Sequence, residues 1–404
     1  MWKEHRIFLE DLEYGSNAKF IPWAEFSDKT FFITGATGLI GYTLASLLLY
    51  HSVEKKSGIK VVALVRDIEK ACEQFSRQLV EGAPIEFVEG AVEDLDASSF
   101  AQKIDYVVHG ACPTASRFFM EHPVETIHTI VKGTDNILRL CVEKHVQAAA
   151  FLSSMEVYGE VSGREKLTEE KLGKIDLFNP RSSYPEAKRL AENLCACYAS
   201  EFNLDVKSVR LAQTFGPGVK YEDARVFAYM MRCALEDRNI ELKTSGAKEN
   251  PYLYTMDAAT AILTVLAKGD RGSSYNAANE ETYCSVREMG WIVLKVFGKT
   301  DLKVLVNVGD NVDTSKYPPE SSMNLSTEKL RGLDWRARSC LPDMYARMSC
   351  SESSENGNKN ISVRDWIGGG YRPKGYLNMS VERLHMLGWH AKFDLDEMFR
   401  RMGG

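Results

Sequence analysis

The chain has little of what marks nucleic-acid-binding, secreted or metal-binding proteins. Its 404 residues include 50 Lys and Arg against 56 Asp and Glu, so the net charge is −6, and no long basic run favours nucleic-acid binding. Met1 to Arg6 lead into an acidic stretch rather than an apolar core, so we expect no signal peptide. The nine cysteines show no paired metal-ligand spacing, because Cys195 and Cys197 are too close together. We therefore expect buried thiols, no metal and a cytoplasmic location.

A membrane partner is not expected either. Residues 31–50 carry no charged side chain and approach membrane-spanning length. They contain three glycines and three threonines, and their pattern changes from strand to helix. These features favour a buried core segment.

The segment from Thr34 to Gly41 is a glycine-rich turn. The apolar run 31–33 precedes it, and an apolar helix-like stretch follows it. Amides at a helix N-terminus bind pyrophosphate, and glycines let the ligand approach closely. A Gly-x-x-Gly-x-x-Gly turn between a strand and a helix therefore predicts a dinucleotide site. The residues predicted to bind the cofactor here are Gly35, Thr37, Gly38, Leu39, Ile40 and Gly41.

Strand-like and helix-like stretches alternate through the first half of the chain. The further strands expected are 60–65, 85–88, 106–109 and 148–153, and the helices between them are 68–79 and 124–144. This alternation predicts an α/β fold, a doubly wound parallel sheet of Rossmann type with a smaller C-terminal α/β substrate lobe. Ligands bind at the carboxyl ends of such strands. Three motifs fall there, namely the glycine turn and the segments 109–113 and 153–159.

Tyr184 and Lys188 are four residues apart in the sequence. On a helix, these two positions share one face. An ammonium beside a phenol favours the phenolate, so it lowers the pKa of the tyrosine towards working pH. A tyrosine tuned in this way is a general acid or base for a hydroxyl or carbonyl. The spacing alone is typical of an exposed helical pair, and its place after the glycine turn favours the chemical interpretation.

The motifs together resemble those of the extended short-chain dehydrogenases/reductases, in the NAD-dependent nucleotide-sugar epimerase/dehydratase family. They are Thr-Gly-x-x-Gly-x-x-Gly from residue 34, Ser-Ser-x-x-Val-Tyr-Gly from 153, Ser-Tyr-x-x-x-Lys from 183, and the segment 210–217. The resemblance implies an enzyme that oxidises a nucleotide sugar at C4 with bound NAD or NADP. Epimerisation or decarboxylation would follow the oxidation.

The same resemblance implies a role for each of four residues. Tyr184, as tyrosinate, takes the proton from the C4 hydroxyl, and Ser154 hydrogen-bonds the same oxygen. Lys188 lowers the pKa of Tyr184 and binds the nicotinamide ribose. Glu156 assists further proton transfers, as in related dehydratases and decarboxylases. The alternative interpretations are a turn serine at position 154 and a solvated loop carboxylate at 156.

Two positions depart from the subfamily patterns. The 4,6-dehydratases of this family carry an Asp at the place of Met155, and a thioether cannot donate a proton, so 4,6-dehydration is disfavoured. UDP-glucuronate decarboxylases, which the chain resembles most, usually carry an Arg at the place of Asn250. An uncharged amide cannot replace a bidentate guanidinium, so decarboxylation and C4 epimerisation both stay open.

Several other positions match the decarboxylase pattern. They are His109, Ala111, Pro113, Arg181 and the segment 223–226. The residues predicted to bind substrate are Pro113, Arg181, Arg225 and Tyr252, the last on a loop where Tyr252 and Tyr254 either close over the nucleotide or pack between the lobes.

The choice between NAD and NADP depends on the end of the second strand. Asp67 would accept a hydrogen bond from the ribose of NAD, whereas Arg66 would pair with the 2′-phosphate of NADP. An Asp that often binds adenine in the family is Ala91 here. We expect NAD, because epimerases and decarboxylases that retain their cofactor favour it, and we keep NADP through Arg66 as the alternative. The predicted cofactor site also includes Ala111, Tyr184 and Lys188.

Two rival functions remain. The first is an NADPH-dependent reductase of a keto-sugar or other carbonyl, which Arg66 favours. The second is a non-catalytic dinucleotide-binding regulator, which the intact Ser154, Tyr184 and Lys188 disfavour.

The predicted organisation has five parts. They are an N-terminal extension (1–29), the NAD(P)-binding Rossmann domain (30–214), an interleaved substrate lobe (215–348), a linker (349–376) and a repeated helical cap (377–404). The repeat relates 324–348 to 378–402, where 11 of 25 positions are identical. In the substrate lobe we expect helices at 226–236, 257–268 and 285–297 and strands at 240–243 and 274–278. We expect Trp2 and Trp23 to dock the extension, and the helices 124–144 and 184–202 to form a homodimer interface, as in the resembled family.

Overall fold

The computed structural model describes residues 6–80, 82–96, 102–161, 163, 165–307 and 322–352. The chain divides into two compact units, Met1–Gly357 and Asn358–Gly404. All described residues belong to the first unit, which is the subject of this section. The predicted repeated cap 377–404, most of the predicted linker, and Trp2 lie outside the described residues.

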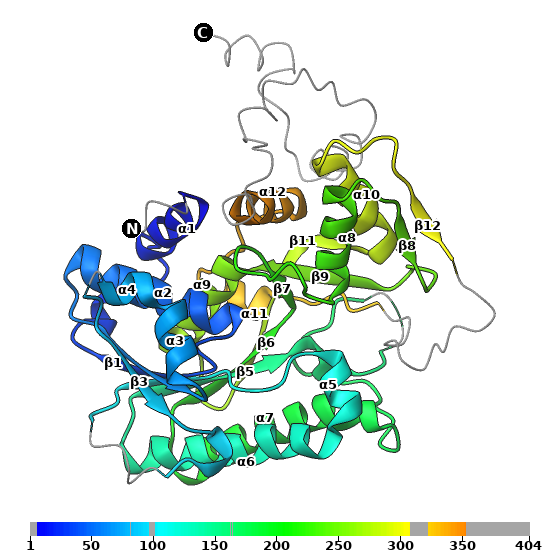
Figure 1. Cartoon of the computed structure of the whole chain (residues 1–404). Coiled ribbons are helices and arrows are strands. Elements are labelled where there is room, and N and C mark those ends of the chain that lie inside the picture. The colour runs from blue at the N-terminus through cyan, green and yellow to red at the C-terminus, as the bar shows by residue number, and fades with distance from the viewer. Residues whose placement is uncertain are drawn as a thin grey trace. The chain divides into compact units, whose positions relative to one another are not determined.

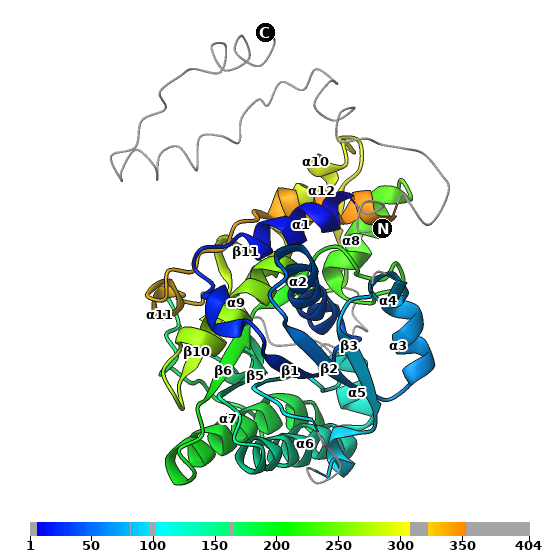
Figure 2. The same cartoon turned by 90° about the vertical axis from the view of Figure 1, so that its left-hand side faces the viewer.

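Seven parallel strands form the main sheet, in the order β10-β6-β5-β4-β1-β2-β3 (Figures 1 and 2). Such a sheet is buried on both faces, so its central strands are mostly apolar, as in β1 and β2. The predicted doubly wound Rossmann sheet is confirmed. Its strands are β1 (Thr30–Thr34), β2 (Lys60–Val65), β3 (Ile85–Glu89), β4 (Tyr106–His109), β5 (Ala148–Ser154), β6 (Val206–Leu211) and β10 (Ser274–Ala277).

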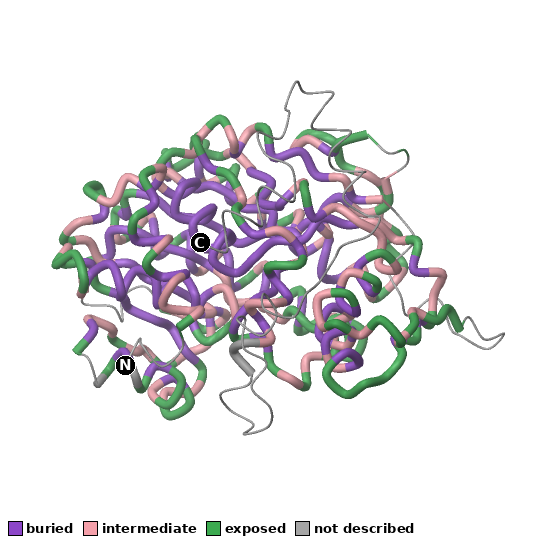
Figure 3. The backbone as a smooth tube through the Cα atoms, turned by 90° about the horizontal axis from the view of Figure 1, so that it is seen from above, coloured by how far each residue is buried: buried purple, intermediate pink, exposed green. Residues whose placement is uncertain are grey.

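Helices cover both faces of this sheet. α6 (Pro123–Glu143) and α7 (Ser183–Glu201) pack together on one face, with α5 (Ser116–Glu121) beside them (Figure 1). α2 (Leu39–Lys55) and α9 (Thr255–Lys268) pack together on the other. α2 has no charged residue before Glu54, and its middle is buried, so the uncharged stretch 31–50 is core. In Figure 3 the buried backbone runs through the interior of this unit, with exposed segments around it.

The smaller lobe contains two short sheets. One has the order β11-β9-β7, and the other pairs β12 with β8. Their strands are β7 (Gln213–Phe215), β8 (Ile240–Leu242), β9 (Glu249–Tyr254), β11 (Asn279–Ser285) and β12 (Val304–Val306). The helices are α8 (Val226–Leu235), α10 (Val286–Val296) and α12 (Leu341–Glu352), whereas α11 (Glu328–Arg331) packs on β10 of the main sheet. α10 begins with a capping box between Ser285 and Glu288, which satisfies its first amides.

Three expectations about element boundaries need correction. The helix expected at 68–79 is two helices, α3 (Ile68–Gln74) and α4 (Ser76–Val80), because the buried ring of Phe75 turns the chain inwards between Tyr42 and Phe87. The strand expected in the substrate lobe at 274–278 is β10, which pairs with β6 in the main sheet. α12 continues past residue 348 into the predicted linker.

The N-terminal extension docks on the rest of this unit. Asp11, on α1 (Arg6–Ser16), accepts hydrogen bonds from Tyr254 and from Arg347 on α12, each at 2.5 Å. Trp23, in the short helix η2 (Trp23–Phe26), stacks on His51 with ring centroids 3.8 Å apart. The predicted docking of Trp23 is confirmed.

Candidate active site

The glycine turn after β1 packs closely on the neighbouring backbone at positions where a side chain would not fit. Gly35 has φ +75°, and a Cβ there would lie 2.9 Å from the amide nitrogen of Ala111. A Cβ on Gly41 would lie 2.1 Å from the carbonyl oxygen of Gly35. Gly38 precedes α2 and offers no side-chain cap, so the first amides of α2 stay available to an anion. This cradle fits the pyrophosphate of a dinucleotide.

Gly41→Ala should therefore impair dinucleotide binding. The added methyl group must push the turn away from α2, which we expect to cost about 1–3 kcal/mol of stability and to weaken NAD binding at least tenfold. Titration of NAD by intrinsic fluorescence, beside a melting curve, checks this. Gly332→Ala is the control, because its Cβ would lie 3.2 Å from the Lys329 carbonyl oxygen and needs only a small shift. Unchanged NAD affinity in Gly41→Ala would contradict the assignment of the cradle.

The ends of β1 and β4 are tied together beneath this cradle. The Thr34 hydroxyl lies 2.7 Å from Nδ1 of His109 and accepts hydrogen bonds from the amides of Gly110 and Ala111. Burial lowers the pKa of His109 to about 3, so its ring is neutral. His109 is therefore a structural residue that fixes the position of Ala111.

A pocket of about 720 Å³ lies at the carboxyl ends of β2 and β3 and reaches the start of α6. Arg66 and Ala91 line it, and four carboxylates against two cations make it acidic. Its charged members are Arg66, Lys132, Glu93, Asp94, Glu121 and Glu125. Asp67 is not among them, because its carboxylate caps α3 by accepting from the amide of Lys70 at 3.0 Å. The pocket fits an uncharged adenosine better than a 2′-phosphate.

Three of the predicted catalytic residues meet at the end of β5 and the start of α7. The side chain of Ser154 hydrogen-bonds Tyr184, and its Oγ also accepts from the amide of Glu156 at 3.2 Å. The Nζ of Lys188 lies 5.8 Å from the Tyr184 ring centroid and donates to the carbonyl oxygen of Leu152 at 2.7 Å. Both Tyr184 and Lys188 are buried. The arrangement can hold a hydroxyl or carbonyl oxygen against a phenol and a serine.

Burial dominates the pKa of the Tyr184 phenol. It raises this pKa well above the usual value, Cys112 and Glu156 raise it further, and the hydrogen bond with Ser154 opposes them. The ring of Phe119 stacks on it at 4.2 Å and excludes water from that side. The lowering of this pKa by Lys188 stays a prediction.

Glu156 and Arg181 form an ion pair beside Tyr184. A guanidinium nitrogen of Arg181 lies 3.0 Å from one Glu156 carboxylate oxygen and 3.3 Å from the other. Both residues act on the pKa of Tyr184, Glu156 raising it and Arg181 lowering it. The structure thus brings these two predicted residues to the phenol.

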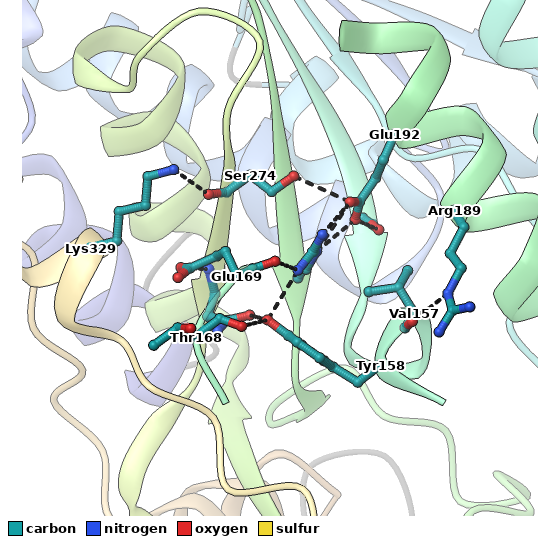
Figure 4. A network of polar contacts seen from close by, with 11 residues as sticks. Val157, Tyr158, Thr168, Glu169, Arg189, Glu192, Ser274 and Lys329 are labelled. Atoms are coloured by element: carbon teal, nitrogen blue, oxygen red, sulfur yellow. Dashed lines mark hydrogen bonds and ion pairs between the residues drawn. The ribbon is translucent and has the colours of Figure 1, made fainter. Parts of the chain in front are cut away.

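A buried polar network holds the segment 153–158 against α7 (Figure 4). Arg210 donates from Nε and a terminal nitrogen to Glu192, at 2.7 to 3.1 Å. Another nitrogen donates to the Tyr158 hydroxyl at 3.1 Å. Glu192 also accepts from the hydroxyls of Ser153 and Ser274. The network fixes the strand end that carries Ser154 relative to the helix that carries Tyr184 and Lys188.

The other residues that the sequence predicts to bind substrate are less available for contact with a ligand. Arg225 is paired with the carboxylate of Asp223, at 2.5 Å, and lies over the ring of Phe227. Tyr252 was expected on a loop but lies within β9, fully buried, with its ring edge-on to Phe215. Tyr254 also lies in β9 and joins the extension, so packing explains this aromatic pair. Pro113 is half-buried, two residues after Ala111.

Sequence reasoning missed three features of this site. Cys112 and Phe119 lie next to Tyr184; Cys112 stands in the motif 109–113 but was given no role, and Phe119 follows that motif. The ion pair between Glu192 on α7 and Arg210 on β6 was missed because its residues lie on different elements, although Arg210 begins the family segment 210–217. Lys248, which interacts with Glu156 and Arg181, precedes β9 by one residue. Lys248 could have been found from its position two residues before Asn250, because alternate residues of a strand share one face.

A parallel doubly wound sheet with a glycine cradle after β1, and with Ser154, Tyr184 and Lys188 at the end of β5, defines a dinucleotide-binding protein of the short-chain dehydrogenase/reductase class. The profile of the NAD dependent epimerase/dehydratase family matches residues 31–278. The chain belongs to that family.

Curated relatives include UDP-glucuronic acid decarboxylases. The chain is 28% identical to UDP-glucuronic acid decarboxylase 6 of Arabidopsis thaliana over 210 residues, which are 52% of this chain and 60% of that protein. It is 26% identical to UDP-glucuronic acid decarboxylase 1 of Xenopus tropicalis over 69% of this chain and 64% of that one. The matched regions thus span less than two thirds of these relatives' lengths.

Solved structures with the same fold include two epimerases. UDP-glucose 4-epimerase of Thermotoga maritima, solved with UDP-glucose, superposes with a TM-score of 0.68 at 20% identity, over 80% of this chain and 99% of that chain. UDP-glucuronic acid 4-epimerase of Bacillus cereus, solved with UDP-glucuronic acid and NAD, gives 0.67 at 22% identity over the same shares. Among the helices that the structure describes, none combines the length and the apolar character needed to cross a membrane.

Proposed function

We propose that the protein is an NAD-dependent nucleotide-sugar-modifying enzyme, which oxidises the sugar at C4 as the first step of epimerisation or decarboxylation. The observation that carries this proposal is the meeting of Ser154, Tyr184 and Lys188 beside the glycine cradle. Family membership and the decarboxylase and epimerase relatives support the same class of reaction.

The chain's own residues divide the work as follows. Tyr184 exchanges the proton of the C4 hydroxyl, and Ser154 hydrogen-bonds the same oxygen. Lys188 holds the ribose next to the nicotinamide from its place under Tyr184. Glu156, fixed by Arg181, is the second proton relay on the sugar side. Bound NAD supplies the hydride acceptor and donor.

NAD is favoured over NADP by the acidic pocket that Arg66 and Ala91 line. A 2′-phosphate there would face Glu93 and Asp94 as well as Arg66, and like charges close together cost free energy. This also disfavours the NADPH-dependent reductase. Cofactor-binding roles for the residues of the cradle, for Arg66 on the adenosine side and for Ala111 belong to this proposal.

4,6-Dehydration, in which hydroxide leaves C6 after oxidation at C4, is not part of the proposal. Met155 is buried, and its thioether has no proton to give to a leaving hydroxide. Arg225 is the candidate for the nucleotide phosphates, although it must first release Asp223. Tyr252 lies too deep in β9 to remain a candidate for substrate contact.

A homodimer is proposed through the outer faces of α6 and α7. Val124 and Ile127 on α6 and Leu190 on α7 are exposed apolar residues, and covering them would gain free energy. A cytoplasmic location agrees with the eight cysteine thiols that the structure describes, which form no disulfide with one another.

Incubation with UDP-, dTDP-, CDP- and GDP-sugars, followed by NMR, tests the proposed function. We expect a C4 epimer or a pentose with release of carbon dioxide, with no net consumption of NAD. A 4-keto-6-deoxy product would overturn the argument from Met155. Oxidation of NADPH by an unrelated carbonyl, without turnover of any nucleotide sugar, would overturn the proposal itself.

A further inference from the structure

Lys248 directly precedes β9 in the smaller lobe. Its carbonyl oxygen accepts from the amide of Val286 at 3.0 Å, which anchors the backbone. The next side chain, Glu249, accepts from the hydroxyls of Tyr283 and Ser322 at 2.9 and 2.8 Å. Because side chains alternate along a strand, Lys248 and Asn250 lie on the opposite face from Glu249.

Lys248 is within electrostatic reach of Glu156 and Arg181, with Glu156 favouring its charged form and Arg181 opposing it. Both also act on Tyr184, so Lys248 belongs to the charged surroundings of the phenol. Lys248 therefore lies on the side of the site where the sugar of the proposed function would be held.

The cluster of Glu156, Arg181 and Lys248 has one positive charge too many. Glu156 is already in an ion pair with Arg181 at 3.0 Å. Lys248 has no carboxylate within 4.0 Å among the residues that the structure describes. Two cations and one carboxylate leave a net charge of +1, and a cation held away from water is costly unless it is paired.

A buried donor of this ion pair also lacks a partner. The Nε of Arg181 makes no hydrogen bond to any described residue. A buried donor without a partner costs free energy, so it points to a polar ligand that completes it.

We propose that Lys248, with Arg181, binds the carboxylate of a nucleotide hexuronate, and that Lys248 makes the enzyme selective for uronates over uncharged hexoses. The inference rests on the proposed function, because the carboxylate on C5 of the sugar is then next to the C4 hydroxyl held by Tyr184. Ammonium and guanidinium together neutralise the carboxylate, and the Nε of Arg181 gains an acceptor.

The protonation of Lys248 supports this role. Burial lowers its pKa to about 8, against a usual value near 10.5, so the amine is still mostly charged at neutral pH. The charged groups that face it are Glu156 and Arg181. Affinity for a carboxylate should therefore fall as the pH rises through 8 and Lys248 loses its proton.

Calorimetric titration of the NAD-loaded full chain with UDP-glucuronic acid and UDP-glucose tests the proposal. We expect the wild-type protein to bind the uronate at least tenfold more tightly. Lys248→Met should weaken binding of the uronate about tenfold to a hundredfold and leave the hexose unchanged, while Lys248→Arg keeps most of the preference. Lys243→Met, an exposed lysine of the same segment, is the matched control and should change neither affinity.

The outcomes separate the two proposals. Equal affinity of the wild-type protein for both sugars, or an equal loss for both in Lys248→Met, would overturn the role of Lys248 and leave the proposed function standing. Failure of both sugars to bind and to reduce the bound NAD would overturn both. If Lys248→Met does not fold, the affinities of the wild-type protein for both sugars are compared at pH 7 and pH 9.5. We then expect the higher pH to weaken binding of the uronate and to leave binding of the hexose unchanged. Equal effects on both sugars would overturn the role of Lys248.

Discussion

Tyr184→Phe should lower turnover of the nucleotide sugar by about 10²- to 10⁴-fold, while the protein folds and binds NAD as before. The change removes only the hydroxyl that hydrogen-bonds Ser154 and would exchange the C4 proton. The ring remains stacked on Phe119, so the packing of α7 is preserved. The effect should appear in kcat more than in KM, because a proton transfer is an interaction of the transition state.

Tyr198→Phe is the matched control for this variant. Tyr198 lies on the same helix, and its hydroxyl donates to Asp135 at 2.7 Å, away from the site. Its loss should leave turnover within about twofold, since only one partly exposed hydrogen bond is removed. Steady-state rates and NAD titration of both variants check the prediction. Undiminished turnover in Tyr184→Phe would show that another group exchanges the proton.

Arg210→Met should destabilise the protein by about 3–5 kcal/mol. The guanidinium is buried and makes three close contacts with Glu192, so its removal leaves a buried carboxylate without its counter-charge. The double variant Glu192→Leu with Arg210→Met should recover part of that loss, because no buried charge then remains unpaired.

Chemical denaturation of these variants measures the effect. Arg139→Met is the control, since Arg139 pairs with Asp135 on the exposed side of α6 and its loss should cost under about 1 kcal/mol. A cost for Arg210→Met no larger than that of the control would contradict the role of the network. Turnover should fall as well, because the network positions Ser154 against Tyr184.

Strands β1 to β5 of the Rossmann sheet could be predicted almost to the residue, whereas β6 was not expected and β10 was assigned to the smaller lobe. Apolar β-branched runs such as 60–65 end at charged or glycine residues, so local chemistry marks both ends. The break at Phe75 could not be predicted, because the helical pattern continues through it and only the packing of its ring against Phe87 turns the chain. Local pattern thus fixes an element, and tertiary contacts decide where it bends.

The candidate site also contains features that the sequence predicts and features that it does not. The spacing of Tyr184 and Lys188 places both on one face of α7, and the motif order brings Ser154 to them. The sequence spacing does not determine which group a flexible lysine ammonium contacts. In the structure the ammonium of Lys188 donates to the carbonyl oxygen of Leu152 on β5. The resemblance implied a loop at Tyr252 and Tyr254, yet the pairing of β9 with β7 and β11 makes this segment a strand.

Deuterium labelling at C4 of UDP-glucuronic acid tests the central claim most directly. If C4 is oxidised and later reduced by the same bound cofactor, deuterium should be found at C4 of the product by NMR, and the labelled sugar should react more slowly than the unlabelled one. Deuterium lost to the solvent, or kept at C4 without any slowing of the reaction, would contradict oxidation at C4.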